Sequence, residues 1–194
     1  TELGYFTETG TISHTGIPLK GNTYCIFQDS KHNIWIATKG EGLVKARPQG
    51  GGHYKLTRYC HSRDDIYSLS DNNVYCVYED VKGRIWVATF GGGINYLTHN
   101  RGGREIFVNH RNNLKGFPID NCHKVRFVTG DHRGNIWIAT TVGALMVNSD
   151  FKKPEDAVFH HCVRVQNDVN SLCNNDGHYI LSTRKNELYL VTFG

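Results

Sequence analysis

Short apolar runs separated by turn residues follow one another along the chain. Between residues 68 and 118 these runs are Val74–Tyr78, Arg84–Thr89, Gly93–Leu97 and Glu105–Asn109. Runs of this length and spacing predict β-strands, and no window has the sustained period of an amphipathic helix. The hydrophobic pattern therefore predicts an all-β fold of short antiparallel strands.

This four-run unit repeats. Trp35, Trp86 and Trp137 are spaced 51 residues apart, and Tyr189 follows after 52. A fixed period of this size indicates a repeat array. The units span residues 17–67, 68–118, 119–170 and 171–194.

The second strand of each unit is apolar on both faces. In the second unit, Ile85 and Val87 share one face, and Trp86 and Ala88 share the other. A strand with two apolar faces lies in a sheet that is covered on both sides. Four-stranded sheets stacked face to face around an axis are covered in this way, so the pattern predicts a β-propeller segment built of four-stranded blades.

The turn between the first two strands of the first three units begins with aspartate and has glycine or asparagine three or four residues later. Aspartate can accept a hydrogen bond from the backbone ahead of it, and glycine or asparagine tolerates a positive φ. A calcium site would need more alternating oxygen ligands than this turn has. The residues expected to be structural are Trp35, Trp86, Trp137, Tyr189, Asp29, Asp80, Asp131, Gly83 and Gly134.

Composition adds few constraints. The chain has 22 Lys and Arg against 18 Asp and Glu, a formal charge of +4, which is too small to imply nucleic acid as a partner. No apolar stretch approaches the length of a membrane helix, and no direct membrane contact is expected. The six cysteines contain no CxxC pair, which favours buried thiols, although a disulfide such as Cys60 to Cys162 stays open.

Catalytic and metal-binding patterns are not found. His160 and His161 are neighbours in a predicted strand, so their rings point to opposite faces and cannot share one metal ion. The sequence has no GxSxG, HExxH or P-loop motif. We therefore expect no enzyme activity, no cofactor and no metal in this segment.

The repeated motif resembles a known family. The second unit reads SLS, then YED, a glycine, IW, AT and GGGI, and it is similar to the two-component regulator propeller repeat. The third unit lacks the Ser-Leu pair, and the fourth has Asn186 for glycine and Tyr189 for tryptophan. The resemblance implies the periplasmic sensor region of a bacterial hybrid histidine kinase, usually with seven-bladed propellers, which detects glycans and is expected to be a homodimer.

Three units are complete, and the fourth is expected to end after its second strand. Residues 1–16 are predicted to hold the last strand of a preceding blade, in the run Gly4–Ile12. Seven blades at this period would need about 350 residues, so we expect a partial propeller that packs against remaining blades or a second copy. The alternative is a closed four-blade ring, in which the N-terminal run would join the last blade and that blade would still lack one strand.

Three functions fit such a fold: a propeller that senses an oligosaccharide or another small ligand, a protein-binding scaffold, and a propeller lyase or hydrolase. The first is preferred. Its site is expected on the rim formed by the loops between blades and the turns between second and third strands, because loops on a rigid frame commonly carry sites. The candidate ligand-binding residues are Lys39, Glu41, Arg63, Asp64, Asp65, Phe90, Arg111, Asn112, Asn167 and Asp168.

Overall fold

The computed structural model describes residues 2–193, which form three complete antiparallel blades flanked by two hairpins. The first blade contains β3 (Thr23–Gln28), β4 (Ile34–Thr38), β5 (Leu43–Gly50) and β6 (His53–Tyr59). The second contains β7 (Val74–Glu79), β8 (Ile85–Thr89), β9 (Gly93–His99) and β10 (Glu105–Val108). The third contains β11 (Val125–Gly130), β12 (Asn135–Thr140), β13 (Gly143–Asn148) and β14 (Phe159–Cys162).

The flanking hairpins pair β1 (Glu2–Phe6) with β2 (Ile12–Pro18) and β15 (Asp176–Ser182) with β16 (Leu188–Phe193). A single α-helical turn, α1 (Ile119–Cys122), precedes β11, and a 3₁₀ turn (Pro154–Asp156) precedes β14. The fold is therefore all-β, as the hydrophobic pattern predicted.

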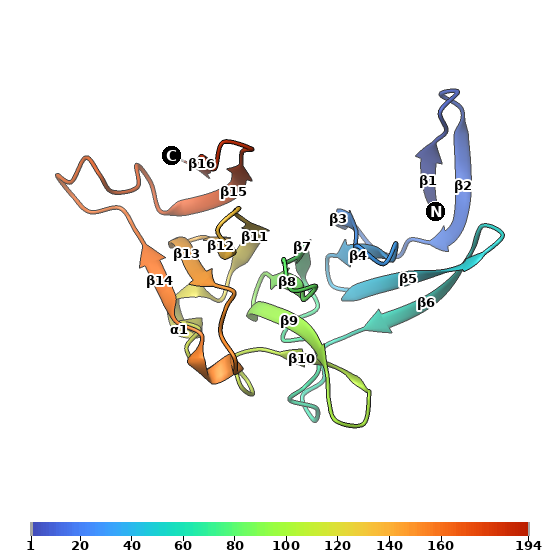
Figure 1. The fold of residues 1–194 in the computed structure, drawn as a ribbon, viewed down its shortest axis with the longest axis horizontal. Helices are drawn as coiled ribbons and strands as arrows, with labels where there is room; N and C mark the ends of the chain where they lie inside the picture. The colour runs from blue at the N-terminus through green and yellow to red at the C-terminus, as the bar shows by residue number, and fades with distance from the viewer. Residues whose placement is uncertain (1, 194) are drawn as a thin grey trace.

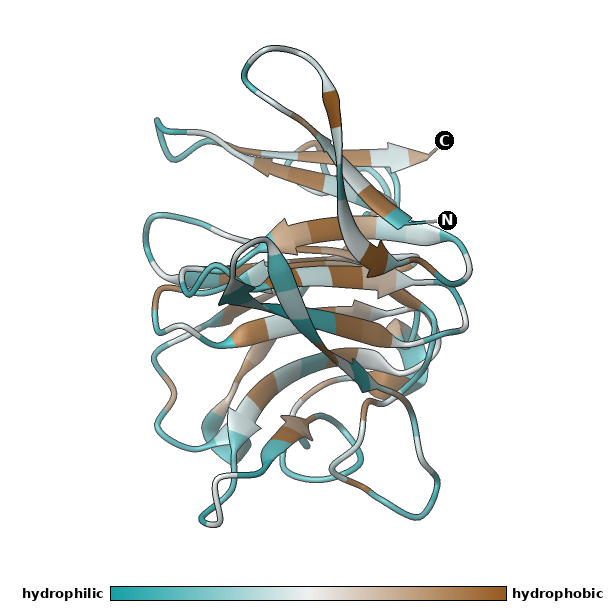
Figure 2. Ribbon diagram, turned by 90° about the vertical axis from the view of Figure 1, so that its right-hand side faces the viewer, coloured by the Kyte–Doolittle hydropathy of each residue, from teal (hydrophilic) through white to brown (hydrophobic). Residues whose placement is uncertain are grey.

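The blades radiate from a common centre. Strands β3, β7, β11 and β15 lie innermost, and the later strands of each blade lie progressively further out (Figure 1). The two hairpins stand at opposite ends of the arc and belong to separate sheets, so the described residues do not close into a four-blade ring. In the side view, hydrophobic residues concentrate in the strands and hydrophilic residues in most connecting turns (Figure 2).

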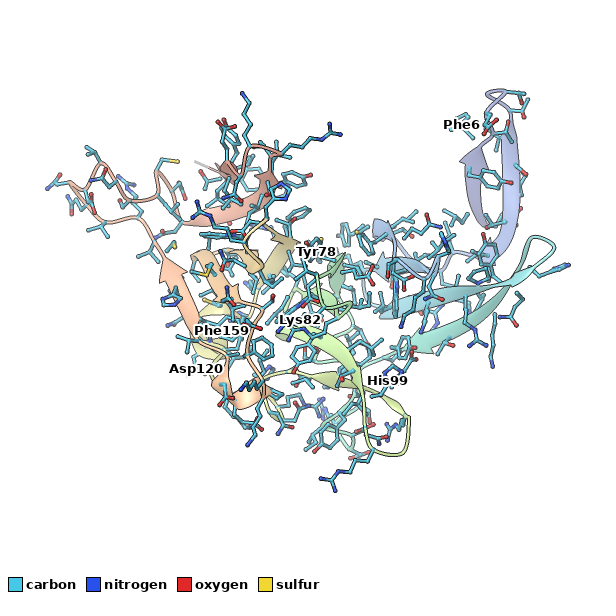
Figure 3. The ribbon with its side chains drawn as sticks, viewed as in Figure 1. Phe6, Tyr78, Lys82, His99, Asp120 and Phe159 are labelled. Carbon is cyan, nitrogen blue, oxygen red and sulfur yellow. The ribbon has the colours of Figure 1, made fainter. Side chains whose placement is uncertain are left out.

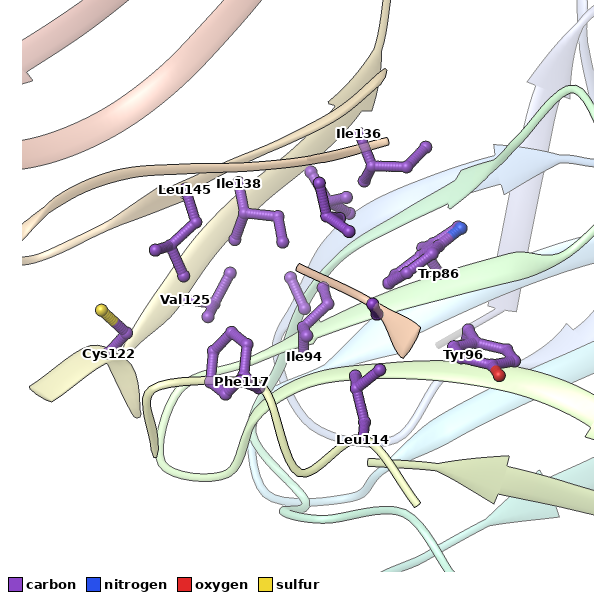
Figure 4. Close-up of a cluster of buried hydrophobic side chains, with 14 of the residues drawn as sticks. Trp86, Ile94, Tyr96, Leu114, Phe117, Cys122, Val125, Ile136, Ile138 and Leu145 are labelled. Carbon is purple, nitrogen blue, oxygen red and sulfur yellow. The ribbon is translucent and has the colours of Figure 1, made fainter. Parts of the chain in front are cut away.

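Apolar side chains fill the interfaces between neighbouring blades. Trp86 of the second blade is fully buried and packs with Ile94, Val125 and Ile136, which come from the second and third blades (Figure 4). Trp35 holds the equivalent place between the first and second blades and is only 1% exposed. Each interface thus has one indole ring at its middle, as expected for blades covered on both faces.

Trp137 differs from the other two tryptophans. The repeat predicts three equivalent buried rings, but Trp137 is only partly buried. Its neighbour is the two-stranded sheet β15–β16, and a cavity of about 480 Å³ lined by Trp137, Ile180 and Leu188 lies between them. Tyr189, at the equivalent place of the fourth unit, is 55% exposed. Two strands cover less of the third blade than four would.

Each tryptophan is also held by the turn aspartate. The indole Nε1 of Trp35, Trp86 and Trp137 donates to the carboxylate six residues earlier, at 2.8, 2.8 and 2.9 Å. Each carboxylate accepts two backbone N–H groups as well, for example those of Lys31 and Asn33 on Asp29. The aspartate therefore fixes the turn and the ring together, so its structural role is larger than the sequence indicated.

The positive-φ residue of this turn is glycine in only two units. Gly83 and Gly134 have φ of 74° and 78°, whereas His32 and Asn186 occupy the equivalent places with φ of 63° and 62°. In the first unit the residue in this conformation is therefore His32 and not Asn33. Asparagine and histidine are among the side chains that tolerate the left-handed region best.

These turns predict a sensitivity to acid. Burial alone would raise the pKa of Asp29 and Asp131, but hydrogen bonds from the turn and the indole outweigh it, and both pKa values are lowered. A carboxyl with a lowered folded pKa stabilises the protein above its unfolded pKa, about 3.9, and loses that contribution as pH falls through the folded value. We expect the melting temperature to drop below about pH 4. The Asp29→Asn variant should show a shallower drop in the same buffers, and an identical acid profile would contradict the assignment.

The N-terminal segment forms a hairpin and not the single strand that was predicted. The chain reverses between Thr7 and Gly10, where the Gly10 N–H donates to the Thr7 carbonyl at 2.9 Å. Ile17 of β2 is 1% exposed and packs on Ile36 and Val44 of the first blade. Phe6 stands near the tip of the hairpin, away from the blades (Figure 3). The run Gly4–Ile12 therefore contains the turn as well as strand residues.

Candidate functional site

The structure places the turns between second and third strands beside the segments that enter the next blade. The N–H of Gly40 donates to the Asn72 carbonyl at 3.1 Å, and the N–H of Gly91 donates to the His123 carbonyl at 3.0 Å. These bonds join neighbouring blades at one rim of the arc. All ten sequence-predicted ligand-binding residues lie in these turns or in the loops between blades.

Several of the predicted rim residues hold the rim together. The Arg111 guanidinium donates to the Ser62 carbonyl at 2.8 Å and contacts His61 Nδ1 at 3.2 Å. Asn112 is 8% exposed, and its side-chain amide donates to the carbonyls of Ile66 and Phe107. Both side chains have their polar atoms engaged within the protein, which leaves them little capacity to bind a ligand.

The aspartates of the rim loops close local turns. Asp65 accepts from the Tyr67 N–H at 2.9 Å, and its other oxygen pairs with Arg104. Asp168 accepts from the Asn170 N–H at 2.9 Å in the equivalent loop of the third unit, next to Asn167, whose φ is 64°. These residues therefore shape the loop backbone, and the similarity of the two loops explains their common Asp-x-x-Ser-Leu pattern.

The remaining rim candidates are more available. Lys39, Glu41, Arg63 and Asp64 are exposed. Glu41 lies beside Arg58, which donates to the Glu41 carbonyl at 2.8 Å. Phe90 is partly buried and faces the centre of the arc, where its ring stacks on Tyr75 at a centroid distance of 4.9 Å. Of the ten predicted residues, the structure brings Phe90 alone into the group described next.

Each of the inner strands β3, β7, β11 and β15 contains a β-bulge, which leaves one residue without a partner on the neighbouring strand. The pairing register shifts between Thr23 and Cys25 in β3, so Tyr24 has no cross-strand partner. The same shift leaves Tyr75 in β7, Arg126 in β11 and His178 in β15 without one. A bulge adds an unpaired residue and redirects its side chain. These four equivalent positions, which sequence reasoning missed, all line one cavity at the centre of the arc.

We call Tyr24, Tyr75, Phe90, Arg126 and His178 the axial arc. The rings of Tyr24 and Tyr75 stack at a centroid distance of 4.3 Å and an interplanar angle of 27°. Tyr75 stacks in turn on Phe90, and the Arg126 guanidinium lies 5.7 Å from the Phe90 centroid. Three aromatic rings and a cation therefore form one continuous ladder that joins three blades.

The charges at the axial arc are arranged around Arg126. Its guanidinium pairs with Asp176 and donates to the Gly177 carbonyl at 3.1 Å. Burial raises the pKa of Tyr75, contact with Tyr24 raises it further, and the Arg126 charge opposes the shift. The Tyr75 phenol is therefore neutral at physiological pH and can both donate and accept a hydrogen bond.

The cavity beside the axial arc has a volume of about 610 Å³. It is lined by the four bulge residues together with Cys25, Ile26, Cys76, Phe127 and Tyr179. This size is within the range of small-molecule sites, which combine apolar walls with a few polar groups. Aromatic faces stack on the apolar faces of ring-shaped ligands, and a guanidinium and phenols form directional hydrogen bonds with hydroxyl or carboxylate groups.

Neither a metal centre nor a membrane helix accompanies this site in residues 2–193. In that range no three His, Cys, Asp or Glu side chains come close enough to hold a metal ion. The helices of the same residues are too short and too polar to cross a membrane. The groups of the axial arc can stack, form hydrogen bonds and carry charge.

Comparisons with known proteins agree with the repeat and the fold. The family model described as two component regulator propeller matches residues 18–40 and 68–91. These stretches contain the aspartate–tryptophan turns of the first two units. The comparison with curated protein sequences found no match.

Solved structures with this fold include the extracellular domain of BT4673 from B. thetaiotaomicron, with a TM-score of 0.66 at 18% identity. The match covers 98% of this chain and 28% of that chain, and another structure of the domain is described as part of a putative hybrid two component system. PorZ, a surface component of the type-IX secretion system of Porphyromonas gingivalis, matches with a TM-score of 0.70 at 16% identity, over 97% of this chain and 27% of that one.

A catalytically inactive H270A variant of virginiamycin B lyase from Staphylococcus aureus, solved with quinupristin, has a TM-score of 0.65 at 14% identity. That match covers 97% of this chain and 55% of the lyase chain. The chain thus spans little more than a quarter of the BT4673 and PorZ chains and about half of the lyase. At these identities the likeness shows the fold, which is that of a β-propeller.

Proposed function

Because the chain carries two-component regulator propeller repeats, we propose that it is the ligand-sensing propeller portion of a bacterial hybrid two-component sensor. The ligand is an oligosaccharide, and it binds at the axial arc. The observation that carries this proposal is the ladder of Tyr24, Tyr75 and Phe90 with Arg126 beside it. Stacked aromatic rings next to a guanidinium suit the alternating apolar faces and polar edges of a sugar.

The location and partners belong to the same proposal. The segment lies in the periplasm, and its neighbours are further blades of the same protein or a second copy. Apolar side chains at both ends of the arc support such neighbours. Ile12 in the hairpin at one end is 64% exposed, and Val191 and Phe193 at the other end are 50% and 54% exposed. Contiguous exposed apolar residues of this kind mark interaction surfaces.

We propose no catalytic step for this segment. Sensing requires that binding energy favours one arrangement of the sensor over another, and nothing in that process breaks a covalent bond. The matching measurement is to incubate the protein with each bound oligosaccharide and to analyse the sugar afterwards. A shortened or unsaturated sugar would contradict the non-enzymatic assignment and favour the lyase or hydrolase alternative.

The binding site is tested with matched pairs of variants in the intact sensor region. Titration calorimetry against a panel of neutral and uronic-acid oligosaccharides supplies the readout. We expect Tyr75→Ala and Arg126→Ala each to weaken binding about tenfold, because losing a stacked ring or a charged hydrogen bond costs roughly 1–1.5 kcal/mol. Tyr67→Ala and Arg63→Ala change the same residue types on the exposed rim, and their affinities should stay at the wild-type value.

The rim remains the alternative position for the site. If Arg63→Ala abolishes binding while Arg126→Ala leaves it unchanged, the ligand binds the rim that the sequence predicted. The Tyr75→Phe variant keeps the stacked ring and removes the hydroxyl, so its affinity separates stacking from hydrogen bonding. Thermal melts of all variants ensure that a lost affinity does not reflect a lost fold.

A further inference from the structure

Side chains that directly follow the bulge meet their counterparts on the next blade. In the third and fourth units these residues are Phe127 and Tyr179, whose ring centroids lie 4.2 Å apart. In the first and second units they are Cys25 and Cys76. The stacking of Tyr24 on Tyr75, one residue earlier, shows that β3 and β7 approach equally closely here. The geometry therefore brings two thiols of different blades together.

The two thiols lie in one packed cluster and have different exposure. Cys25 packs against the hydrophobic cluster that contains Cys76. Cys76 is 3% exposed, and its Sγ lies 3.6 Å from the Val128 carbonyl oxygen, whereas Cys25 is partly buried. Both line the central cavity of about 610 Å³. A reagent that enters this cavity can therefore reach the more exposed Cys25 first.

The two thiols also differ in acidity. The interaction with Cys76 lowers the pKa of Cys25 to about 7 despite its burial, while the interaction with Cys25 and burial raise the pKa of Cys76. Cys25 is therefore the more acidic thiol of the pair. The thiolate is the form that attacks a disulfide.

We propose that Cys25 and Cys76 are a modification site, where a dithiol–disulfide couple joins the first and second blades covalently at the centre of the propeller. No other pair of cysteines in residues 2–193 occupies equivalent positions on adjacent inner strands. Both side chains line the same cavity on adjacent inner strands, so forming a bond of about 2.05 Å needs the two side chains to turn toward each other. The alternative Cys60–Cys162 pairing links a residue after β6 with the end of β14, two blades apart. All six cysteines, including Cys25 and Cys76, are free thiols in this structure.

A low-molecular-weight disulfide such as oxidised glutathione serves as the oxidant. The Cys25 thiolate attacks one sulfur of the reagent, forms a mixed disulfide and releases one reduced thiolate. Cys76 then loses its proton to solvent and attacks Cys25 Sγ, which forms the protein disulfide and releases the second thiolate. Two protein thiols have then been oxidised by two electrons, and one molecule of oxidised glutathione has become two reduced thiols.

The test uses the full-length protein and oxidised glutathione. After incubation, free thiols are alkylated, and the protein is digested and analysed by mass spectrometry. We expect a cross-linked peptide pair containing Cys25 and Cys76, with a mass lower by two hydrogen atoms than the sum of the reduced peptides. The loop closed by this bond spans about 50 residues, so the oxidised protein should melt roughly 10 °C above the reduced one.

Variants distinguish this pair from the other thiols. Cys25→Ser and Cys76→Ser should each abolish the cross-link and the rise in melting temperature, whereas Cys60→Ser, which changes an exposed cysteine, should keep both. A stable glutathione adduct on Cys25 with Cys76 still alkylatable in the wild-type protein overturns the proposal. A cross-link between Cys76 and any other cysteine overturns it as well. Neither outcome bears on whether an oligosaccharide binds the axial arc.

Discussion

Replacing Trp86 by alanine should lower the free energy of unfolding by about 3–5 kcal/mol, the usual cost of deleting a large buried ring. The indole is fully buried. Its ring lies 5.1 Å from that of Tyr96 and 6.4 Å from that of Phe151, and the Arg84 guanidinium lies 5.6 Å away. The substitution would leave a cavity between two complete blades, which cannot collapse without shifting a sheet. Urea unfolding monitored by circular dichroism measures the loss.

Trp137→Ala is the matched control within the same chain. The residue has the same place in the repeat and the same bond to its aspartate, but its ring is only partly buried beside β15–β16. The smaller area removed from water should give a smaller loss of stability. If the two alanine variants unfold at the same urea concentration, burial between complete blades is not what makes Trp86 important.

Replacing Asp80 by alanine should also cost about 3–5 kcal/mol, because removing one partner of a buried ion pair leaves the other charge uncompensated. Its carboxylate accepts from Arg84 Nε at 2.7 Å and from Trp86 Nε1 at 2.8 Å. It also accepts the backbone N–H groups of Lys82 and Arg84 at 2.9 and 3.0 Å. All four donors would lose their acceptor at once. Chemical denaturation again supplies the measurement.

Asp150→Ala provides the comparison for this variant. Asp150 pairs with Lys82 at 2.6 Å, but it is exposed to solvent, and exposed pairs contribute little. A stability loss for Asp80→Ala no greater than for Asp150→Ala would show that the turn is held by other means. Trp86→Phe keeps an aromatic ring and removes the indole N–H, so a double-mutant cycle with Asp80→Ala reports how strongly the ring and the turn are coupled.

The repeat period and the apolar second strand were enough to predict the blades. Spacing locates Trp35 and Trp86, and a strand with two apolar faces requires covering sheets, so blade architecture follows from the sequence. The burial of Trp137 does not follow, because it depends on how many strands the next sheet presents. The N-terminal hairpin was missed because Gly10 lies inside a run that reads as β-rich.

The Ser-Leu-Ser motif was recognised as a pattern, but its purpose is visible only in three dimensions. Ser70 N–H donates to Asn95 Oδ1 at 3.0 Å, and Asn95 Nδ2 donates to Ser70 Oγ at 2.8 Å. Asn109 Nδ2 donates to the same Asn95 oxygen at 3.0 Å. This buried polar network ties the loop before β7 to the outer strands of its own blade. Partners 25 and 14 residues apart in sequence could not be paired from a period alone.

The sequence predicts a site on the rim because loops on a rigid frame commonly carry sites. The structure gives two of the predicted residues, Arg111 and Asn112, a structural role, because their side chains donate to loop carbonyls. The bulge residues were hidden because alternation with a period of two cannot show an inserted residue. Their signal is in the sequence nonetheless: Tyr24, Tyr75, Arg126 and His178 recur at the repeat period, and three residue types occupy the four positions.

The bulges have a consequence for how such a protein can diversify. A residue outside the ladder has no cross-strand partner to match, so its side chain can change without changing the register of the strands. One such position recurs in each blade and faces the same central space. A library that varies residues 24, 75, 126 and 178 while keeping the rest of the chain would therefore sample ligand specificities combinatorially on a constant frame. Gene duplication of one blade would supply each new position already facing the central cavity.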